Sequence, residues 1–341
     1  MEQLRIELFG ALRLHRGERP FSGGFRTQKS KELFAFLVLG RERSYPRSML
    51  ATVFWGDHPE PEARTNLRHN LSDIRKLLLN NGIDPDSYLT IGSNEIAFNP
   101  SADFWLDVAE FEMHCDSAES DPHSPLGREG KESLGRALAL YRGELLESVY
   151  EDWCQHEREA LRDRFLNALA CLMQYHLTHR EWDAAIAHGK RLLRHDVLLE
   201  HIHRDLMHCY YRAGNRPLAL KQFMECERRL REELDVGPME ETKTLYQHIL
   251  NEDTEGIDRI CGELLGSLAS RLQRPSDQVD RTISNLNVAR KQLDDASAKI
   301  KKAIQDMLGL SGERGSSSVE CALQFAFVAG GIAAAAAIWP F

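Results

Sequence analysis

The chain has 341 residues, of which 42% are hydrophobic, and a formal net charge of -9 at pH 7. This length allows two or three domains with cores of their own, and the acidic total argues against strong nonspecific binding to nucleic acid at physiological salt. The 7 cysteines are odd in number and form no Cys-x-x-Cys pair, which indicates small buried thiols in a reducing cytoplasm rather than a disulfide framework.

The chain opens with a pattern that predicts a small sheet and then a helix. Apolar and polar residues alternate over 4–8 and again over 12–15, with Gly10 between the two runs, which is the periodicity of strands. A helix is expected over 28–39, and Gly40 marks its end.

The next segment predicts a second helix, a turn and a third helix. The second is expected over 46–55, since Pro46 suits a first helical turn, and a turn follows over 56–61. Over 62–79, side chains placed about 100° apart form a stripe that faces a core. This stripe consists of Ala63, Leu67, Asn70, Leu71, Ile74 and Leu78. The other side carries Thr65, Arg68, His69, Ser72 and Lys76, with Arg64 and Arg75 at its flanks.

The polar side of this third helix suits entry into DNA. Cationic donors reach phosphates, and hydroxyl or amide groups reach base edges in a major groove about 12 Å wide. The base-reading candidates are Thr65, Arg68, His69 and Ser72. The phosphate candidates are Arg47, Arg64, Arg75 and Lys76. Taken alone, such a segment is more often a plain solvated surface helix.

A hairpin is expected directly after the third helix. Two short apolar runs, 88–91 and 95–98, flank Gly92, Ser93 and Asn94, which are turn residues. A sheet, three helices and a hairpin in this order predict a winged helix, in which the third helix reads the major groove and the hairpin forms the wing. The acidic total does not oppose this prediction, because a local field acts over about one Debye length, roughly 8 to 10 Å.

Residues 1 to about 112 resemble the OmpR-type winged helix that opens the antibiotic-regulatory-protein (SARP) and related bacterial transcriptional activators. The resemblance implies a regulator of transcription. The residues that carry it are Leu33-Phe34-Ala35-Phe36-Leu37, Leu50, Phe54-Trp55-Gly56-Asp57, Ala63, Leu67-Arg68-His69-Asn70-Leu71, Ile74-Arg75-Lys76-Leu77-Leu78, Asp107-Val108 and Phe111.

Beyond a polar segment, the chain predicts helical repeats. Residues 113–130 are rich in Ser, Asp, Pro, Gly and Glu, as in a solvated linker. Helical pairs are then expected at a spacing near the 34-residue period of tetratricopeptide repeats, an arrangement that exposes a groove for protein binding. The expected helices are 157–179 with 182–195, and 199–213 with 217–234.

This half is similar to the bacterial transcriptional activation domain (BTAD) that follows the winged helix in the same regulators. One departure is Val197, where the family usually has a proline, so the local turn geometry is open. The matching residues run from Tyr150-Glu151-Asp152-Trp153 through Ala185-Ile186, Leu199-Glu200, Ala213-Gly214-Asn215 and Gly237-Pro238 to Leu245-Tyr246.

No motif points to an enzyme, a cofactor or a metal. The chain lacks a nucleotide-binding loop of the glycine-lysine-serine/threonine type, so energy-driven switching is not expected. His203-Arg204-Asp205-Leu206 mimics a kinase catalytic loop, but Tyr210 occupies the position of its asparagine. The nearby histidines His201 and His208 have no cysteine or carboxylate at a zinc-site spacing.

The remaining residues predict a helical extension over 253–313. Its second helix, expected over 277–308, carries an apolar residue at every seventh position, as in a coiled-coil seam. The seam consists of Val279, Leu286, Leu293, Ile300 and Met307. Pairing between two chains is favoured, because a twofold regulator matches repeated half-sites on DNA, and an antiparallel hairpin within one chain is the alternative.

The tail over 314–341 ends in an uncharged apolar stretch, 321–341, which is long enough to cross a bilayer. Glycines and weakly apolar alanines interrupt it, so a buried or membrane-surface helix, or a tail ordered by a partner, fits as well. The start of the chain has no signal-peptide pattern, which predicts a cytoplasmic protein, tethered to the inner membrane if the tail inserts.

Taken together, the sequence predicts a mainly α-helical protein with a small β component. The expected domains are a winged helix over 1–112, a linker over 113–130, a TPR-like domain over 131–252, the extension and the tail. The expected function is sequence-specific DNA binding by a transcriptional activator whose repeats contact RNA polymerase or a signal partner. The alternative is a scaffold in which the repeats bind protein and the winged helix has become a protein-binding module.

Overall fold

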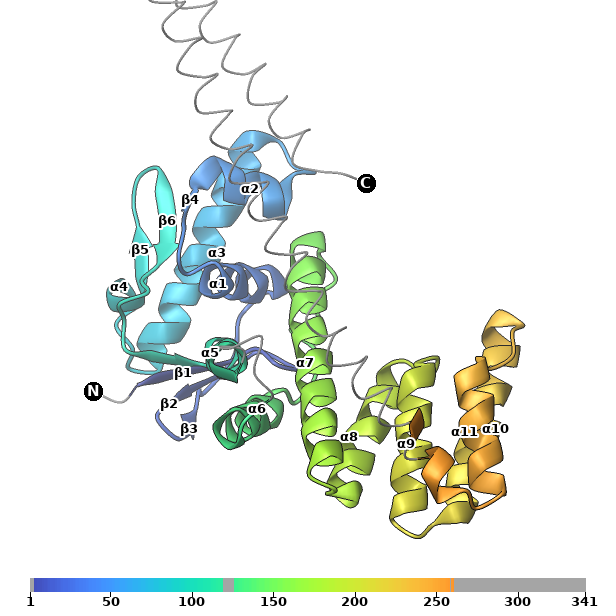
Figure 1. Cartoon of the computed structure of the whole chain (residues 1–341). Coiled ribbons are helices and arrows are strands. Elements are labelled where there is room, and N and C mark those ends of the chain that lie inside the picture. Colours follow the sequence, from blue (N-terminus) through green and yellow to red (C-terminus); the bar gives the residue numbers. More distant parts are fainter. Residues whose placement is uncertain (1–2, 119–125, 258, 261–341) are drawn as a thin grey trace, which may run out of the picture. The chain divides into compact units, whose positions relative to one another are not determined.

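The computed structural model describes residues 3–118, 126–257 and 259–260. In this part of the chain helices dominate and the strands are short, so the predicted mainly α-helical fold with a small β component is confirmed (Figure 1). The first sheet has the strand order β3-β2-β1-β7. It consists of β1 (Leu4–Glu7), β2 (Arg13–Arg16), β3 (Arg19–Pro20) and β7 (Phe104–Leu106), the last parallel to β1.

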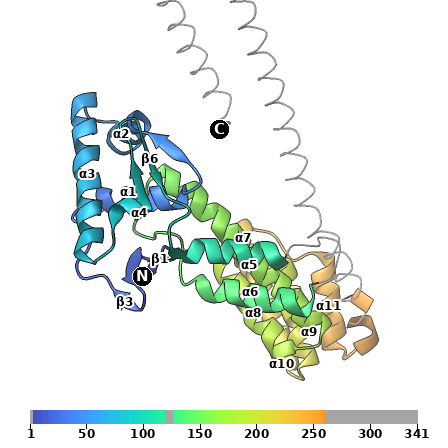
Figure 2. The same cartoon turned by 90° about the vertical axis from the view of Figure 1, so that its left-hand side faces the viewer.

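Three helices follow the first strands, as the sequence predicts. They are α1 (Gln28–Leu39), α2 (Arg47–Trp55) and α3 (Glu60–Asn80). The expected start of the second helix at Pro46 is one residue early, because Pro46 ends the short strand β4 (Ser44–Pro46) and lies at the N-cap of α2. Figure 2 shows α3 along an outer edge of this part of the molecule.

The predicted hairpin is present after the one-turn helix α4 (Pro85–Tyr88). Its strands, β5 (Leu89–Ile91) and β6 (Glu95–Phe98), pair in antiparallel register with Leu89 opposite Phe98. The strand β4 joins the other edge of β6, so the wing is a three-stranded sheet rather than an isolated hairpin. This order of helices and strands is that of a winged helix.

One hydrophobic core holds α1, α3 and the wing together. Phe34 of α1 and Phe98 of β6 are fully buried and meet edge to face with ring centroids 6.3 Å apart. Leu67, Ile74 and Leu78 of α3 are at most 1% exposed. The expected stripe on α3 is therefore its core-facing side.

The rest of the described chain is helical, from α5 (Asp107–Ala118) to α11 (Glu240–Leu250). The helices between them are α6 (Arg128–Leu140), α7 (Asp152–Thr178), α8 (Trp182–His195), α9 (Glu200–Arg212) and α10 (Arg216–Leu234). The segment 113–130, expected as a solvated linker, is helical at both of its described ends, because α5 continues to Ala118 and α6 begins at Arg128. The position of a domain boundary there stays a prediction.

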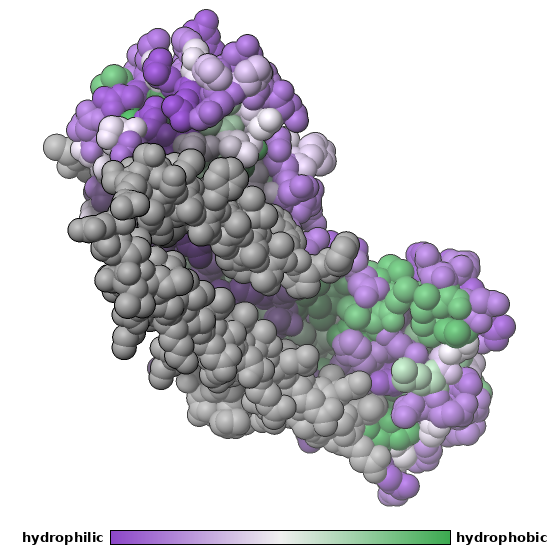
Figure 3. Space-filling view, turned by 90° about the horizontal axis from the view of Figure 1, so that it is seen from above, coloured by the Kyte–Doolittle hydropathy of each residue, from purple (hydrophilic) through white to green (hydrophobic). Residues whose placement is uncertain are grey.

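Small residues allow the paired helices to approach closely, as expected for TPR-like repeats. Ala185 of α8 and Ala219 of α10 are fully buried. A Cβ atom added at Gly189 of α8 would lie 2.9 Å from the side chains of both Leu206 and Met173, so α8 packs tightly between α7 and α9. The space-filling view in Figure 3 shows hydrophobic residues gathered on the surface of the helical half. Met224 and Leu234 of α10 are among the exposed large hydrophobic residues of the described chain.

The expected extension and tail lie almost wholly outside the described residues. The coiled-coil seam from Val279 to Met307 and the apolar stretch over 321–341 lie outside the described residues, so both stay predictions. Among the helices of the described residues, none combines the length and the apolar character that a membrane span requires.

Candidate nucleic-acid interface

The exposed side of α3 carries the residues that the sequence singled out. Arg64, Thr65, Arg68, His69 and Lys76 are exposed, whereas Ser72 and Arg75 are half-buried. Arg68, His69 and Lys76 make no hydrogen bond or ion pair with any residue that the structure describes. Two cationic side chains and an imidazole are therefore available to a ligand over this side of the helix.

The other candidates on α3 already have partners within the chain. The Thr65 hydroxyl donates to the carbonyl of Pro61 at 2.8 Å, and Arg64 pairs with Glu60 at 2.5 Å. Arg75 donates two hydrogen bonds to Asp86 of α4, at 2.5 and 3.1 Å. The hydrogen bond to Asp86 raises the pKa of Arg75, and the same bond lowers the pKa of Asp86. Arg75 thus holds α4, and with it the base of the wing, against α3.

The wing turn is joined to the start of α2. The backbone N–H of Arg47 donates to the carbonyl of Asn94 at 2.8 Å, and its guanidinium donates to the carbonyl of Gly92 at 3.3 Å. Ser44 of β4 donates to Glu95 of β6 at 2.6 Å. The phosphate candidate Arg47 and the wing candidates Gly92, Ser93 and Asn94 are therefore parts of one local structure.

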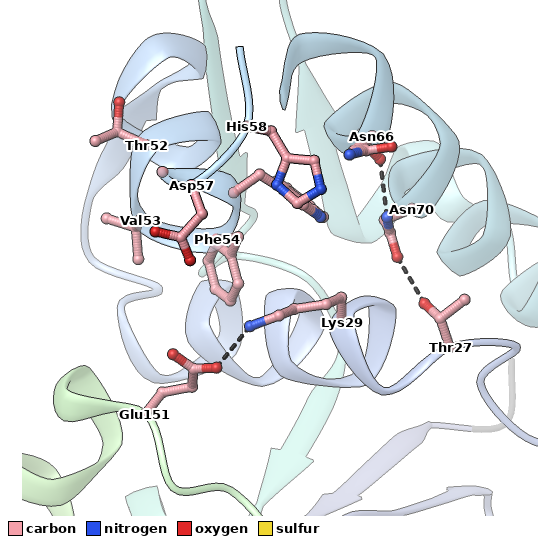
Figure 4. Close-up of a pocket in the computed structure, with 12 residues that line it drawn as sticks. Thr27, Lys29, Thr52, Val53, Phe54, Asp57, His58, Asn66, Asn70 and Glu151 are labelled. Carbon is pink, nitrogen blue, oxygen red and sulfur yellow. Dashed lines mark hydrogen bonds and ion pairs between the residues drawn. The ribbon is translucent and has the colours of Figure 1, made fainter. Parts of the chain in front are cut away.

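The buried side of α3 is fixed to α1 by a polar chain. The Thr27 hydroxyl donates to Asn70 Oδ1 at 2.7 Å, and Asn70 Nδ2 donates to the carbonyl of Asn66 at 2.8 Å (Figure 4). Thr27 is also the N-cap of α1, where its oxygen accepts from the N–H of Ser30. This chain restrains the rotation of α3 about its axis and so determines which side chains face outward.

A cavity of about 570 Å³ lies between α1, α3 and the turn after α2. Asn66 and Asn70 contribute to its wall, whereas Arg68 and His69 do not. Lys29 and Glu151 close another part of the wall and point toward each other (Figure 4). The cavity therefore borders the contact between the winged helix and the helical half.

That contact combines an ion pair with aromatic rings. Lys29 Nζ lies 2.6 Å from Glu151 and 3.2 Å from Glu32. Burial lowers the pKa of Lys29, but the hydrogen bond to Glu151 and the charge of Glu32 outweigh it, so the pKa is raised. Trp153 meets Phe36 edge to face at 5.2 Å, and its ring lies 6.2 Å from that of Phe54.

A second contact joins β1 to the segment before α7. The N–H of Gly10 donates to Glu144 at 2.7 Å, and the N–H of Leu146 donates to Leu8 at 3.0 Å. Asp107, fully buried, accepts from the N–H groups of Leu8 and Phe9. Burial raises the pKa of Asp107.

The sequence did not predict either contact, although Glu151, Trp153 and Asp107 are among the residues that carry the family resemblance. Lys29, Glu151 and Trp153 come from distant parts of the chain, and no local period connects them. For Asp107 the family resemblance was the only signal. A carboxylate between two apolar residues does not by itself predict a buried contact.

Two residues of the segment that mimics a kinase catalytic loop, His203 and Arg204, make hydrogen bonds within the helical half. His203 Nδ1 accepts from the Gln222 amide at 2.6 Å, and its Nε2 donates to the carbonyl of Val197 at 3.0 Å. Arg204 donates to Thr242 at 3.1 Å. Within the described part of the chain, no group of three or more His, Cys, Asp or Glu side chains is arranged to hold a metal ion.

Comparison with known proteins places the helical half in a family. Residues 106–250 match the bacterial transcriptional activator domain. The match begins within β7, so it includes α5, which the sequence analysis assigned in part to the linker.

Two regulators are similar over most of this chain. It is 27% identical to the regulatory protein AfsR of Streptomyces griseus over 254 residues, which cover 74% of this chain and 25% of that protein. It is 24% identical to the transcriptional regulatory protein EmbR of Mycobacterium bovis over 255 residues, 74% of this chain and 64% of EmbR. The chain therefore spans about a quarter of AfsR and somewhat under two thirds of EmbR.

A solved structure has the same fold. The structure of Mycobacterium tuberculosis EmbR in complex with a low affinity phosphopeptide superimposes with a TM-score of 0.60 at 22% sequence identity. The match covers 77% of this chain and 70% of the EmbR chain. The resemblance that the sequence carries is confirmed by these comparisons.

Proposed function

Since residues 106–250 match the bacterial transcriptional activator domain and the chain is similar to AfsR and EmbR, we propose that it is a sequence-specific DNA-binding regulator of transcription. In this proposal α3 enters the major groove and the wing lies beside it on the backbone. The regulator is an activator in the cytoplasm, and it has no enzymatic activity or cofactor.

One observation carries the proposal. On α3, Arg68, His69 and Lys76 face outward without a partner in the described chain, while the opposite side of the same helix is buried against α1 and α2. Exposed cations on a fixed helix match the phosphates and base edges of a duplex, and their field acts locally although the total charge is negative.

The proposed roles follow from these surroundings. Base edges are read by the group nearest the middle of the exposed side, Thr65, Arg68, His69 and Ser72. Phosphates are contacted by Arg47, Arg64, Arg75 and Lys76, and by the wing turn Gly92, Ser93 and Asn94. Arg75 contributes least, because Asp86 already neutralises it.

The helical half has the partner contacts in this proposal. Its repeats bind RNA polymerase or a signal protein, as an array of helical pairs exposes a groove for such contacts. The predicted seam over 277–308 pairs two chains into a homodimer on repeated half-sites. The apolar stretch over 321–341 is the proposed point of any membrane contact.

Binding to DNA against salt concentration tests the function. Duplexes selected by the full chain from a random library would be titrated between about 50 and 200 mM salt. If the four phosphate candidates each release a counterion, log affinity falls against log salt with a slope of about -3 to -4 per chain. A chain that selects no duplex, but captures protein through its repeats, would instead support the scaffold function.

A further inference from the structure

A second cavity, of about 310 Å³, lies far along the chain from α3, where α6, α7 and α8 meet. Each helix contributes residues at helical spacing: Lys131, Gly135, Leu138 and Ala139 from α6, Leu172 and His176 from α7, and His188 and Arg191 from α8. The lining is thus an apolar floor with four nitrogen-bearing side chains and no carboxylate. A volume near 300 Å³ is at the small end for pockets that hold organic ligands.

Arg191 is the cation that lacks a partner. It is half-buried and makes no hydrogen bond or ion pair with any described residue, although its guanidinium lies 5.3 Å from the Phe165 ring. Burial, together with the charge of Arg194, lowers the pKa of Arg191. A guanidinium in partial burial gains from a planar anion that accepts two parallel hydrogen bonds.

The other three polar residues that line the cavity are Lys131, His176 and His188, and they differ in how many partners each has. Lys131 Nζ lies 3.5 Å from Glu181, whose carboxylate also accepts a hydrogen bond from His176 Nδ1. The His176 and His188 rings stack at 5.3 Å, and His188 Nδ1 is buried without a partner in the described chain. Burial lowers the pKa of His188 to about 4, so the ring is neutral at pH 7 and offers a hydrogen bond without charge.

We propose that this cavity binds a small organic carboxylate with an apolar body, its carboxylate paired with Arg191 and assisted by Lys131. A carboxylate fits better than a dianionic phosphate, because Arg191 is the single cation that is not already shared with Glu181. The apolar body lies against Leu138 and Leu172. The proposed carboxylate site does not depend on the proposed DNA binding, so the two proposals are tested by separate measurements.

Calorimetric titration of the full chain with benzoate at pH 7 tests the site. Benzoate should bind saturably with one equivalent per chain, and benzyl alcohol, its neutral analogue, should not bind. Arg191→Gln should weaken benzoate by about tenfold or more, the scale of one charge-assisted pair. Arg194→Gln, an exposed neighbour outside the cavity, is the matched control and should leave the affinity unchanged.

Two further variants separate the site from a general effect of charge or folding. Glu181→Gln should release Lys131 and tighten benzoate binding. If the effect were only one of total charge, Arg194→Gln, which removes a positive charge, would weaken benzoate binding. Gly135→Leu should block the cavity without harming the fold, because an added Cβ at Gly135 meets no atom within 4 Å and leucine is a better helix former. Absence of saturable binding to the wild-type chain, or equal affinity in Arg191→Gln, overturns the proposal.

Discussion

Two helical turns separate Arg68 from Arg75 on α3, and the two side chains differ in whether they have an ion-pair partner. Arg75 is held by Asp86, whereas Arg68 reaches outward with no described partner. A side chain already neutralised in the folded protein gains less from a phosphate than a side chain that is not. At the scale of single residues, the free arginine is therefore the one to test for base reading.

Replacing Arg68 with alanine should reduce discrimination between selected and scrambled duplexes by about 1 to 3 kcal/mol, the usual value of a bidentate contact to a base. Competition binding at fixed salt measures this difference. Arg231→Ala removes an equally exposed arginine from α10 and serves as the control. Equal losses on both duplexes would assign Arg68 to the phosphate backbone instead.

The neutral His188 predicts how stability depends on pH. Its pKa is about 4 in the folded chain, against 6.5 for an unperturbed histidine, so the unfolded chain binds a proton that the folded chain does not between these values. The groups facing it are Lys131, His176 and Arg191. The free energy of unfolding should therefore fall as pH drops from 6.5 to 4, by at most about 3 kcal/mol from this group.

His188→Gln should make that fall shallower, because glutamine is polar and does not titrate. Urea unfolding at pH 7, 6, 5 and 4 compares the two chains. His179→Gln, in which an exposed histidine at the end of α7 is removed, is the control. Parallel curves for wild type and His188→Gln would mean that His188 does not contribute to the pH dependence.

At the scale of elements, the wing turn and the start of α2 form one local structure, which faces phosphates in the proposed complex. Arg47→Ala removes both a cation and the hydrogen bond to the Gly92 carbonyl, so the wing turn loses one of its supports. Affinity for all duplexes should fall alike, and the salt slope should become shallower by about one. Arg47→Lys should restore most of the salt slope. A loss confined to the selected duplex would place Arg47 at a base edge.

The elements predicted well are those that a local pattern determines. The helices α1 and α8 have the expected bounds. In each, apolar residues recur at helical spacing over several turns, and a cap or a breaker then follows. The strand β4 was missed because three residues are too few for a period and their pairing partner, β6, is distant in sequence. The helix α11 begins two residues after Pro238. It was not predicted as a separate helix, and only the family resemblance marked its residues.

The candidate site divides in the same way. The outward residues of α3 follow from helical geometry, and the structure places Arg68 and His69 on the exposed side as expected. The partners that tie down Arg75 and Arg47 are not predictable locally, because Asp86 and Gly92 reach them through folding of the loop and the hairpin. Sequence indicated which side of the helix faces outward, but not which of its cations are free.

At the scale of the whole described molecule, the winged helix and the activator half are joined at two contacts. Backbone hydrogen bonds connect Leu8 and Gly10, just after β1, to the residues before α7, and Trp153 packs on aromatic rings of α1 and α2 beside the Lys29 to Glu151 pair. Contacts of this kind couple the unfolding of two regions when their free energy is comparable to the stability of either region alone.

The wild-type chain should therefore unfold its winged helix and activator half in one calorimetric transition. Trp153→Ala removes the ring that packs on Phe36 and Phe54, at a cost of about 3 kcal/mol, and should separate the transition into two. Trp105→Ala, at a tryptophan on β7 that packs on Arg5, is the matched control and should lower the temperature of a single transition. Two transitions in the wild type, or one in Trp153→Ala, would mean that the aromatic contact does not couple the halves.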